Sequence, residues 1–242
     1  MNSLEACVPN VTRARAWRLY TERGRLVDLA QAGGAALLGH KNRGYLQALK
    51  NAAGRGLFAP LPSHYEARFK KALSRLFPER VFGIYRLPPK FNGNFELWRP
   101  FSGRLEEAAL GSEVFSPVIP SALSPFVLAA VKHAADRLPP SEIISPFVLA
   151  CAANTLWAII MHPERGTLCF PQIENALREN AVWTRHGIYL FYNGSEDWKN
   201  VFLRFLESGF LLPASSDEPV ILPGELSPGE EKNLARLLIN AP

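Results

Sequence analysis

Cysteine is scarce in this sequence, which holds only Cys7, Cys151 and Cys169 among 242 residues. None of the three forms a Cys-x-x-Cys pair with another, and three thiols are too few for a disulfide framework. A disulfide-stapled secreted domain and a cysteine-based zinc site are therefore excluded. The cysteine content instead fits a reducing compartment.

Long apolar runs are also absent. The most apolar stretch, residues 147–161, is shorter than the roughly 20 residues that a helix needs to cross a bilayer, and it contains Asn154 and Thr155. The first ten residues include Glu5 and have no apolar core, so they do not read as a secretory signal. We expect a buried helix at residues 146–161, no membrane association and a cytoplasmic location.

The signatures of common catalytic and nucleotide-binding sites are missing as well. The sequence has no GxSxG, GxxxxGK[ST] or GxGxxG pattern, so no motif supports a serine hydrolase or a nucleotide-binding loop. Its histidines lack the HExxH or HxH spacing of a metal site, and we expect no metal. They are His40, His64, His133, His162 and His186.

Acidic residues are scarce in the first half of the chain. Residues 1–100 hold 17 Lys and Arg against 6 Asp and Glu, whereas residues 101–242 hold 10 against 16. One interpretation is a basic nucleic-acid surface, and the other is one fold whose two halves have complementary charge. The sequence has no RNP motif, zinc finger or aromatic–basic interleaving, so nucleic acid is the weaker interpretation.

Material for a hydrophobic core is plentiful, at 48% hydrophobic and 11% aromatic residues. The order of predicted elements shows no sustained strand–helix–strand alternation, which predicts the α+β class, with helices packed on a small, mainly antiparallel sheet. We divide the chain into residues 1–82, an irregular connecting segment at 83–120, and residues 121–242. The first and last segments are expected to pack as one unit, because neither has enough strands to cover its apolar helices.

Helices are predicted where apolar residues recur every three or four positions, and strands where β-branched and aromatic residues gather. Ser63 with Glu66 and Ser227 with Glu230 form predicted capping boxes, and Ser195 is a predicted N-cap. The predicted helices are 12–23, one starting at 42, 63–77, 124–137, 146–161, one following 171, one starting at 195, and one starting at 227. The predicted strands are 26–30, 95–98, 187–192, 210–212 and 219–222, and we expect the first to lie close to the last two.

Two parts of the chain resemble class III aminotransferases. In the first, the sequence LVDL at 26–29, Gly33-Gly34 and Leu38-Gly39-His40 precede a helix. This arrangement is similar to the strand and turn that lead into the first helix of the family's small domain. In the second, SGFLLP at 208–213 and SPGE at 227–230 resemble the family's last strand and helix. The likeness covers about residues 15–80 and 145–240.

The resemblance implies a fold-type I pyridoxal-phosphate enzyme. Such an enzyme needs a lysine for the imine, a carboxylate for the pyridinium nitrogen and a cup for the phosphate. In the family these come from a large domain between the two resembling parts. Only residues 80–145 occupy that interval here, so we expect this domain to be largely missing. No catalytic or cofactor-binding residue is therefore assigned, and no cofactor is expected.

The remaining candidate site residues are Gly33, Gly34, Gly39 and His40, which match a family loop that borders the substrate pocket. The alternative is that the glycines only form turns and that His40 only leads into a helix.

Three functional hypotheses follow. The leading one is a catalytically degenerate, aminotransferase-like protein that acts as a binding or oligomer-forming module, with itself or another protein as partner. The second is an active pyridoxal-phosphate-dependent aminotransferase that a partner chain completes. The third is a nucleic-acid-binding protein that uses the basic first half.

Overall fold

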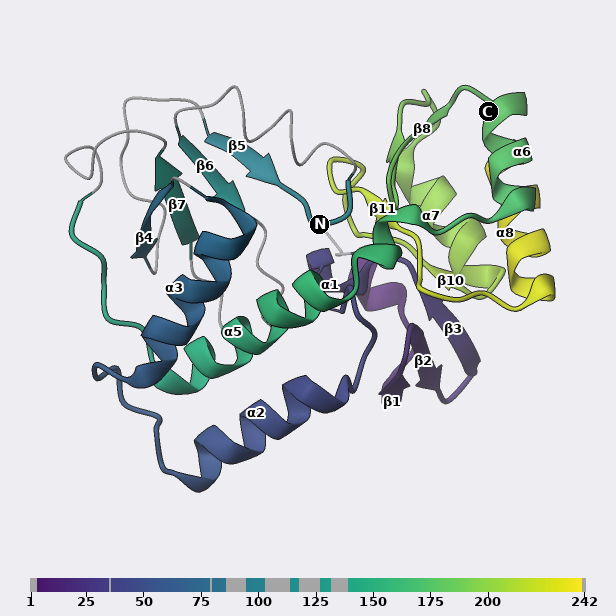
Figure 1. Ribbon diagram of the computed structural model, residues 1–242. Helices are drawn as coiled ribbons and strands as arrows, with labels where there is room; N and C mark the ends of the chain where they lie inside the picture. The colour runs from purple at the N-terminus through teal and green to yellow at the C-terminus, as the bar shows by residue number, and fades with distance from the viewer. Residues whose placement is uncertain are drawn as a thin grey trace. The chain divides into compact units, whose positions relative to one another are not determined.

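The computed structural model describes residues 4–34, 36–78, 80–85, 95–102, 114–117, 127–131 and 139–240 (Figure 1). The chain forms two compact units. The terminal unit combines Met1–Lys41 with Glu164–Pro242, and the central unit is Asn42–Pro163. In the described part of the chain, no helix is both long enough and apolar enough to cross a membrane.

The terminal unit is made of short strands and helices from both ends of the chain. The N-terminal part contains η1 (Leu4–Cys7), β1 (Val11–Arg15), β2 (Arg18–Thr21), β3 (Gly24–Asp28) and α1 (Gln31–Gly34). The C-terminal part contains η3 (Pro163–Thr167), α6 (Pro171–Glu179), β8 (Trp183–His186), β9 (Tyr189–Tyr192), α7 (Trp198–Glu207), β10 (Phe210–Leu211), β11 (Val220–Ile221) and α8 (Pro228–Ile239).

One four-stranded sheet joins the two ends of the chain, in the order β1-β2-β3-β10. β10 runs parallel to β3 with Phe210 opposite Val27, and the N–H of Ile221 donates to the carbonyl of Leu29 just beyond β3. The expected proximity of strand 26–30 to the C-terminal strands is therefore confirmed. This pairing links positions more than 180 residues apart, and it carries the candidate site described below.

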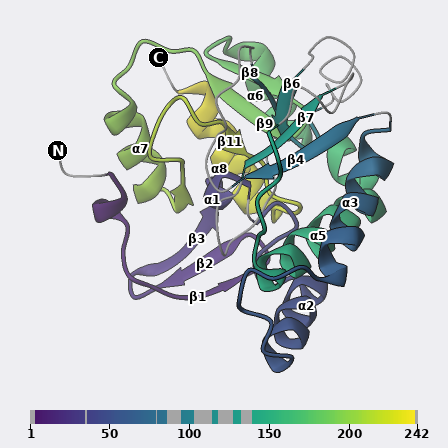
Figure 2. The same ribbon diagram turned by 90° about the vertical axis from the view of Figure 1, so that its left-hand side faces the viewer.

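The predicted helix at residues 12–23 is wrong, because this segment forms the antiparallel strands β1 and β2 (Figure 2). Ala16 has φ 48°, in the left-handed region, where it turns the chain between the two strands. Across the hairpin, the Arg13 guanidinium lies 4.1 Å from the centre of the Tyr20 ring. Gly24, with φ 131°, begins β3 instead of ending a helix. Apolar residues three positions apart thus belonged to strands whose β-branched and aromatic side chains favour a sheet.

The second sheet of the terminal unit has the order β11-β9-β8, with antiparallel neighbours. Its strands lie near α6 and α8, which pack against each other (Figure 1). The capping box of Ser227 and Glu230 at the start of α8 is confirmed. The predicted cap at Ser195 is wrong, because α7 begins after Asp197, whose side chain accepts the N–H of Lys199. A carboxylate two residues later in the chain thus takes the capping role.

The central unit is built around helix α5 (Pro146–Met161), against which α2 (Arg43–Gly54) and α3 (His64–Leu76) pack. Ten of its residues are buried, among them Leu149, Ala152 and Leu156, which confirms the expectation of a helix enclosed by protein. Asn42 caps α2 as its sequence predicts. Ser63 stands at the N-cap of α3 but makes no capping hydrogen bond, so the predicted capping box with Glu66 is wrong. Glu66 instead forms an ion pair with Lys70, one turn along the helix.

The central unit also holds a sheet in the order β4-β7-β6-β5. Its strands are β4 (Val81–Tyr85), β5 (Phe95–Trp98), β6 (Val114–Pro117) and β7 (Val127–Val131). β7 contradicts the predicted helix at 124–137, because Val127–Val131 pairs antiparallel with β4. Valines at both ends of this segment favour a strand, and the pairing partner lies some 45 residues away, beyond the reach of a local pattern. The rest of that predicted helix lies outside the described residues.

The α+β class is confirmed for the described residues. Their strands form small mixed sheets, mostly antiparallel, with parallel neighbours at β3–β10 and β5–β6. The division into residues 1–82, 83–120 and 121–242 stays a prediction, because much of the middle segment lies outside the described residues.

Candidate functional site

The glycine–histidine segment between β3 and α2 contains all four site residues that the sequence singled out. It leaves the sheet at Asp28 and returns beside the β1–β2 hairpin at His40. Gly33, Gly34 and Gly39 all have positive φ, at 64°, 109° and 83°. Their backbone thus adopts the left-handed conformations that glycine permits at the least cost.

Residues 31–34 form a left-handed turn, which we call the 31–34 turn. Gln31 and Ala32 have φ 46° and 47°, so even the residues with side chains lie in the left-handed region. Such strain persists only when the surroundings hold the backbone in place. Asp28 provides part of that hold, since its Oδ1 accepts the N–H groups of Ala30 and Gln31 at 3.1 and 2.8 Å.

The side chain of Gln31 anchors the 31–34 turn to the C-terminal part of the chain. Gln31 is fully buried, and its Nε2 donates to the carbonyl of Ile221 at 2.9 Å. Its Oε1 is buried and has no hydrogen-bond partner in the described part of the chain. A buried amide donor without a hydrogen-bond partner is costly. The bond from Gln31 to Ile221 therefore holds the 31–34 turn in a fixed position relative to β11.

His40 lies beside the carboxylate that holds the turn. Its Nε2 is 2.7 Å from Oδ2 of Asp28, and the Asp28 side chain is 4% exposed against 23% for His40. The backbone of His40 pairs with that of Ala16 in an isolated bridge. Gly39 is needed there, because a Cβ at this position would lie 3.1 Å from Cα of Ala16. One carboxylate therefore fixes both the start of the 31–34 turn and the imidazole.

A buried arginine, Arg165, bonds to the backbone of the same segment at Leu37. Arg165 is 5% exposed and donates to the carbonyls of Leu37 and Pro223 at 3.1 and 3.0 Å, and to that of Leu222. Its guanidinium lies 5.2 Å from the centre of the Trp17 ring, and Trp17 Nε1 also donates to Leu37. Burial lowers the pKa of Arg165 to about 10. No sequence pattern indicated this residue, because its partners are backbone carbonyls far along the chain.

The chemistry available here is that of an oriented imidazole. A carboxylate can hold a histidine ring in a fixed orientation. Within the described residues, Asp28 is the hydrogen-bonding partner of the His40 ring, and no hydroxyl or thiol is bonded to it as a nucleophile would be. No hydrogen bond joins His40 to Gly33 or Gly34 in that part of the chain. Their place at a substrate pocket stays a prediction, whereas their role in forming turns is visible.

Sequence reasoning missed two further residues of this site, Asp28 and Gln31. Asp28 appeared only in the middle of the predicted strand 26–30 and within the LVDL sequence of the resemblance, although an aspartate that precedes a glycine-rich turn often accepts backbone N–H groups. That pattern was the available signal. Gln31 offered none, because its partner lies 190 residues away.

Lysines and metal ligands bear on which cofactors could bind. Pyridoxal phosphate requires a lysine whose amine is shielded enough to lose its proton, and a solvated lysine does not meet this need. Every lysine that the structure describes is exposed, namely Lys41, Lys50, Lys70, Lys71, Lys199 and Lys232. Lys90 and Lys132 lie outside the described residues. The described lysines therefore do not fit this cofactor, and no group of three potential metal ligands occurs among the described residues.

Comparison of the sequence with known proteins finds distant relatives. No protein-family model matches the sequence. An uncharacterized protein of Treponema pallidum is 25% identical, with 88% of each chain covered. An uncharacterized protein of Borreliella burgdorferi is 24% identical, with 95% of this chain and 90% of that protein covered.

Comparison with solved structures finds aminotransferases. A glutamate-1-semialdehyde aminomutase from Pseudomonas aeruginosa superposes with a TM-score of 0.73 at 13% identity, covering 96% of this chain and 87% of that one. An omega-transaminase from Sphaerobacter thermophilus gives a TM-score of 0.70 at 10% identity, with 96% and 90% covered. Plasmodium falciparum ornithine delta-aminotransferase gives 0.68 at 11% identity, with 96% and 92% covered. The fold of this chain is therefore similar to that of aminotransferases.

Proposed function

We propose that this chain is an aminotransferase-like protein without pyridoxal-phosphate catalysis, and that it acts as an oligomer-forming module through contact between two copies. The terminal unit would be the counterpart of the small domain of fold-type I aminotransferases. The observation that carries the proposal is a pair of exposed apolar side chains, Phe58 and Leu61, on the loop between α2 and α3.

The loss of catalysis is supported by the lysines and by the strand pairing of the central sheet. The described lysines are all exposed, whereas an imine-forming lysine needs an environment shielded from solvent. The sheet at residues 81–131 has antiparallel neighbours at β4–β7 and β6–β7, which need no crossover helix, and one parallel pair at β5–β6.

The self-association surface is supported by exposure and by a rigid mounting. Phe58 and Leu61 are 59% and 63% exposed. Ser145 Oγ donates to the carbonyl of Phe58 at 2.8 Å, and the N–H of Phe147 donates to that of Leu57 at 3.1 Å. The rings of Phe58 and Phe147 lie 5.5 Å apart, so the loop is tied to the start of α5. Because the loop is already held in place, its association with a partner costs little further ordering of the chain.

The part of the chain that carries this loop also favours a second copy as the partner. In the aminotransferases that the sequence resembles, the N-terminal segment packs at the dimer interface. Phe58 and Leu61 belong to the corresponding segment here, within residues 1–82. A symmetric contact would place the same loop of both copies together, as two-fold dimers require.

Sedimentation equilibrium tests the oligomer. We expect a species of twice the 26.9 kDa chain mass, and we expect the double variant Phe58→Ser/Leu61→Ser to sediment as a monomer. Met161→Ser is the matched control, because Met161 is 70% exposed at the end of α5 and should leave the dimer intact. A wild-type monomer at all concentrations, or a dimer that the double variant does not weaken, overturns the proposal.

Borohydride reduction in the presence of pyridoxal phosphate tests the loss of catalysis. We expect sparse labelling spread over several lysines and no imine absorbance band that borohydride abolishes. Lys132, beside His133 in the sequence, is the lysine to examine first by peptide mapping. Stoichiometric labelling of one lysine, lost on its substitution by alanine, would show an active pyridoxal-phosphate enzyme instead.

A further inference from the structure

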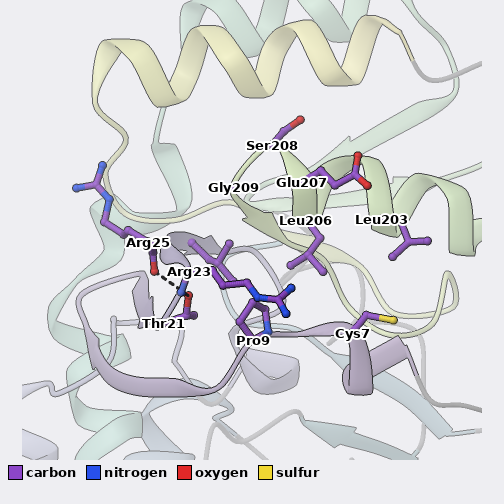
Figure 3. A pocket seen from close by; sticks show the side chains of 12 residues that line it. Cys7, Pro9, Thr21, Arg23, Arg25, Leu203, Leu206, Glu207, Ser208 and Gly209 are labelled. Carbon is purple, nitrogen blue, oxygen red and sulfur yellow. Dashed lines mark hydrogen bonds between the residues drawn. The ribbon is translucent and has the colours of Figure 1, made fainter.

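A pocket of about 570 Å³ opens in the terminal unit, between the β2–β3 turn and the end of α7 (Figure 3). This volume is in the range of small-molecule sites. The walls come from three stretches of chain: Cys7 and Pro9, residues 21–26, and residues 203–209. The pocket lies wholly outside the central unit, so it is independent of the contact surface proposed above.

The chain segments that form the pocket are held in place by hydrogen bonds. Thr21 Oγ1 donates to the carbonyl of Gly24 at 2.9 Å and accepts the N–H of Arg23 at 3.2 Å, which closes the β2–β3 turn. On the opposite wall, the carbonyl of Gly209 accepts the N–H of Val27 at 2.8 Å. The parallel pairing of β3 with β10 thus joins the two walls and leaves the pocket preformed.

One cation faces this pocket without a partner. Figure 3 shows the Arg23 side chain extending between Pro9 and Leu206. In the described part of the chain, its guanidinium makes no hydrogen bond or ion pair. The neighbouring Arg25 is different, because its guanidinium is paired with Glu230 at 3.1 Å and points away from the pocket in Figure 3. Arg23 is therefore the cation available to a ligand.

The rest of the lining is mainly apolar. Leu26 is a buried lining residue, and Pro9, Leu203 and Leu206 are half-buried side chains that contribute carbon surface. Glu207 adds one negative charge at the rim. A single unpaired arginine in a pocket that also contains one carboxylate gives a weak field for a dianion, so phosphate and nucleic acid are disfavoured. An arginine fork matches a carboxylate, and the carbon surface matches an apolar body.

We infer that this pocket binds a small organic monocarboxylate with an apolar body. The carboxylate accepts hydrogen bonds from Arg23, and the apolar body lies against Leu203, Leu206 and Pro9. No covalent step is involved. The site is a binding site distinct from the 28–40 segment.

Calorimetric titration of the full chain tests the site with octanoate as the probe. We expect saturable binding of octanoate, at least about tenfold weaker binding of 1-octanol and of acetate, and no binding of inorganic phosphate at the same concentrations. Arg23→Gln should weaken octanoate binding about tenfold. Arg15→Gln, which removes the same charge from an exposed position on β1, should leave it unchanged.

The free thiols of the chain give a second, independent measurement. Cys7 is exposed and lines the pocket, whereas Cys169 is exposed elsewhere in the terminal unit. Octanoate should slow the alkylation of Cys7 by iodoacetamide and leave the rate at Cys169 unchanged. Absence of saturable octanoate binding, equal binding of 1-octanol, tighter binding of phosphate, or binding that Arg23→Gln does not weaken would each overturn the inference. So would equal protection of the two thiols.

Discussion

The Nε2 atom of His40 lies 2.7 Å from Oδ2 of Asp28, and the other oxygen of the same carboxylate accepts the N–H groups of Ala30 and Gln31. Twelve residues separate the two side chains in sequence, and the 31–34 turn lies between them. This carboxylate is the point where a strained turn, a β-strand and a histidine are held together. Its removal should therefore affect more than one hydrogen bond.

Substitution of Asp28 by Asn tests this role. The amide keeps the size of the side chain but loses the charge that strengthens its three hydrogen bonds, so we expect about 2–4 kcal/mol lower free energy of unfolding. The backbone amides of Ala30 and Gln31 should also exchange hydrogen faster. Urea unfolding measures the first effect, and amide exchange the second. Asp217→Asn is the control, because Asp217 is exposed. It should change the free energy of unfolding by less than about 0.5 kcal/mol. A larger change in this control would mean that the Asp28→Asn result is not specific to Asp28.

Arg165 should stabilise the same segment through geometry more than through charge. Arg165→Met removes the buried donor of the Leu222 and Pro223 carbonyls, whereas the Leu37 carbonyl keeps Trp17 Nε1, and we expect a loss of about 2–4 kcal/mol. Arg165→Lys restores the charge but not the planar fork, so it should recover only part of the loss. Unfolding midpoints in urea compare the three proteins. Full recovery by lysine would contradict the geometric explanation.

The ion pair between Arg18 and Glu230 should make stability depend on acid pH. Burial raises the pKa of Glu230, but hydrogen bonds from Arg18 and Ser227 outweigh it and bring the pKa from 4.5 to about 2. A carboxyl whose pKa is lower in the folded state stabilises the fold above its unfolded pKa. That contribution is lost as the pH falls from about 4.5 to about 2.

Unfolding followed by circular dichroism across this pH window provides the measurement. Glu230→Gln should flatten the pH dependence, whereas Glu225→Gln should leave most of it, because the Glu225 side chain is 63% exposed and pairs with Arg18 from solvent. An identical slope in the Glu230→Gln variant and the wild type would rule out the assignment.

Helix α5 offers a test of the core of the central unit. Leu156 is fully buried between α5 and its neighbours, so Leu156→Asp would place an unpaired carboxylate in an apolar environment. We expect destabilisation by several kcal/mol, on the order of 3–5, or failure to fold. Met161→Asp, on the same helix but 70% exposed, should leave the unfolding midpoint nearly unchanged. Equal midpoints for the two variants would show that α5 is not enclosed.

Local patterns determined the helices of this protein to a large extent. The proline after Ser145 and the apolar run that follows predicted α5 with its observed start and end. Asn42 likewise predicted the start of α2, and the capping box of Ser227 and Glu230 predicted the start of α8. These predictions succeed because a cap acts on backbone groups within three residues of itself. The family resemblance also singled out the segment that contains Gly33, Gly34, Gly39 and His40. All three of these glycines adopt positive φ.

Only the tertiary structure decided where the strands pair and what surrounds His40. Residues 12–23 look helical by spacing, yet the turn at Ala16 and the pairing with β3 make them a hairpin. Strand pairing depends on a partner and a register that can lie anywhere in the chain, as β10 does for β3. The same holds for Gln31 with Ile221 and Arg165 with Leu37, whose contacts span 190 and 128 residues. A hydrogen bond between residues so far apart leaves no periodic trace in sequence, because its geometry exists only once the sheet has formed.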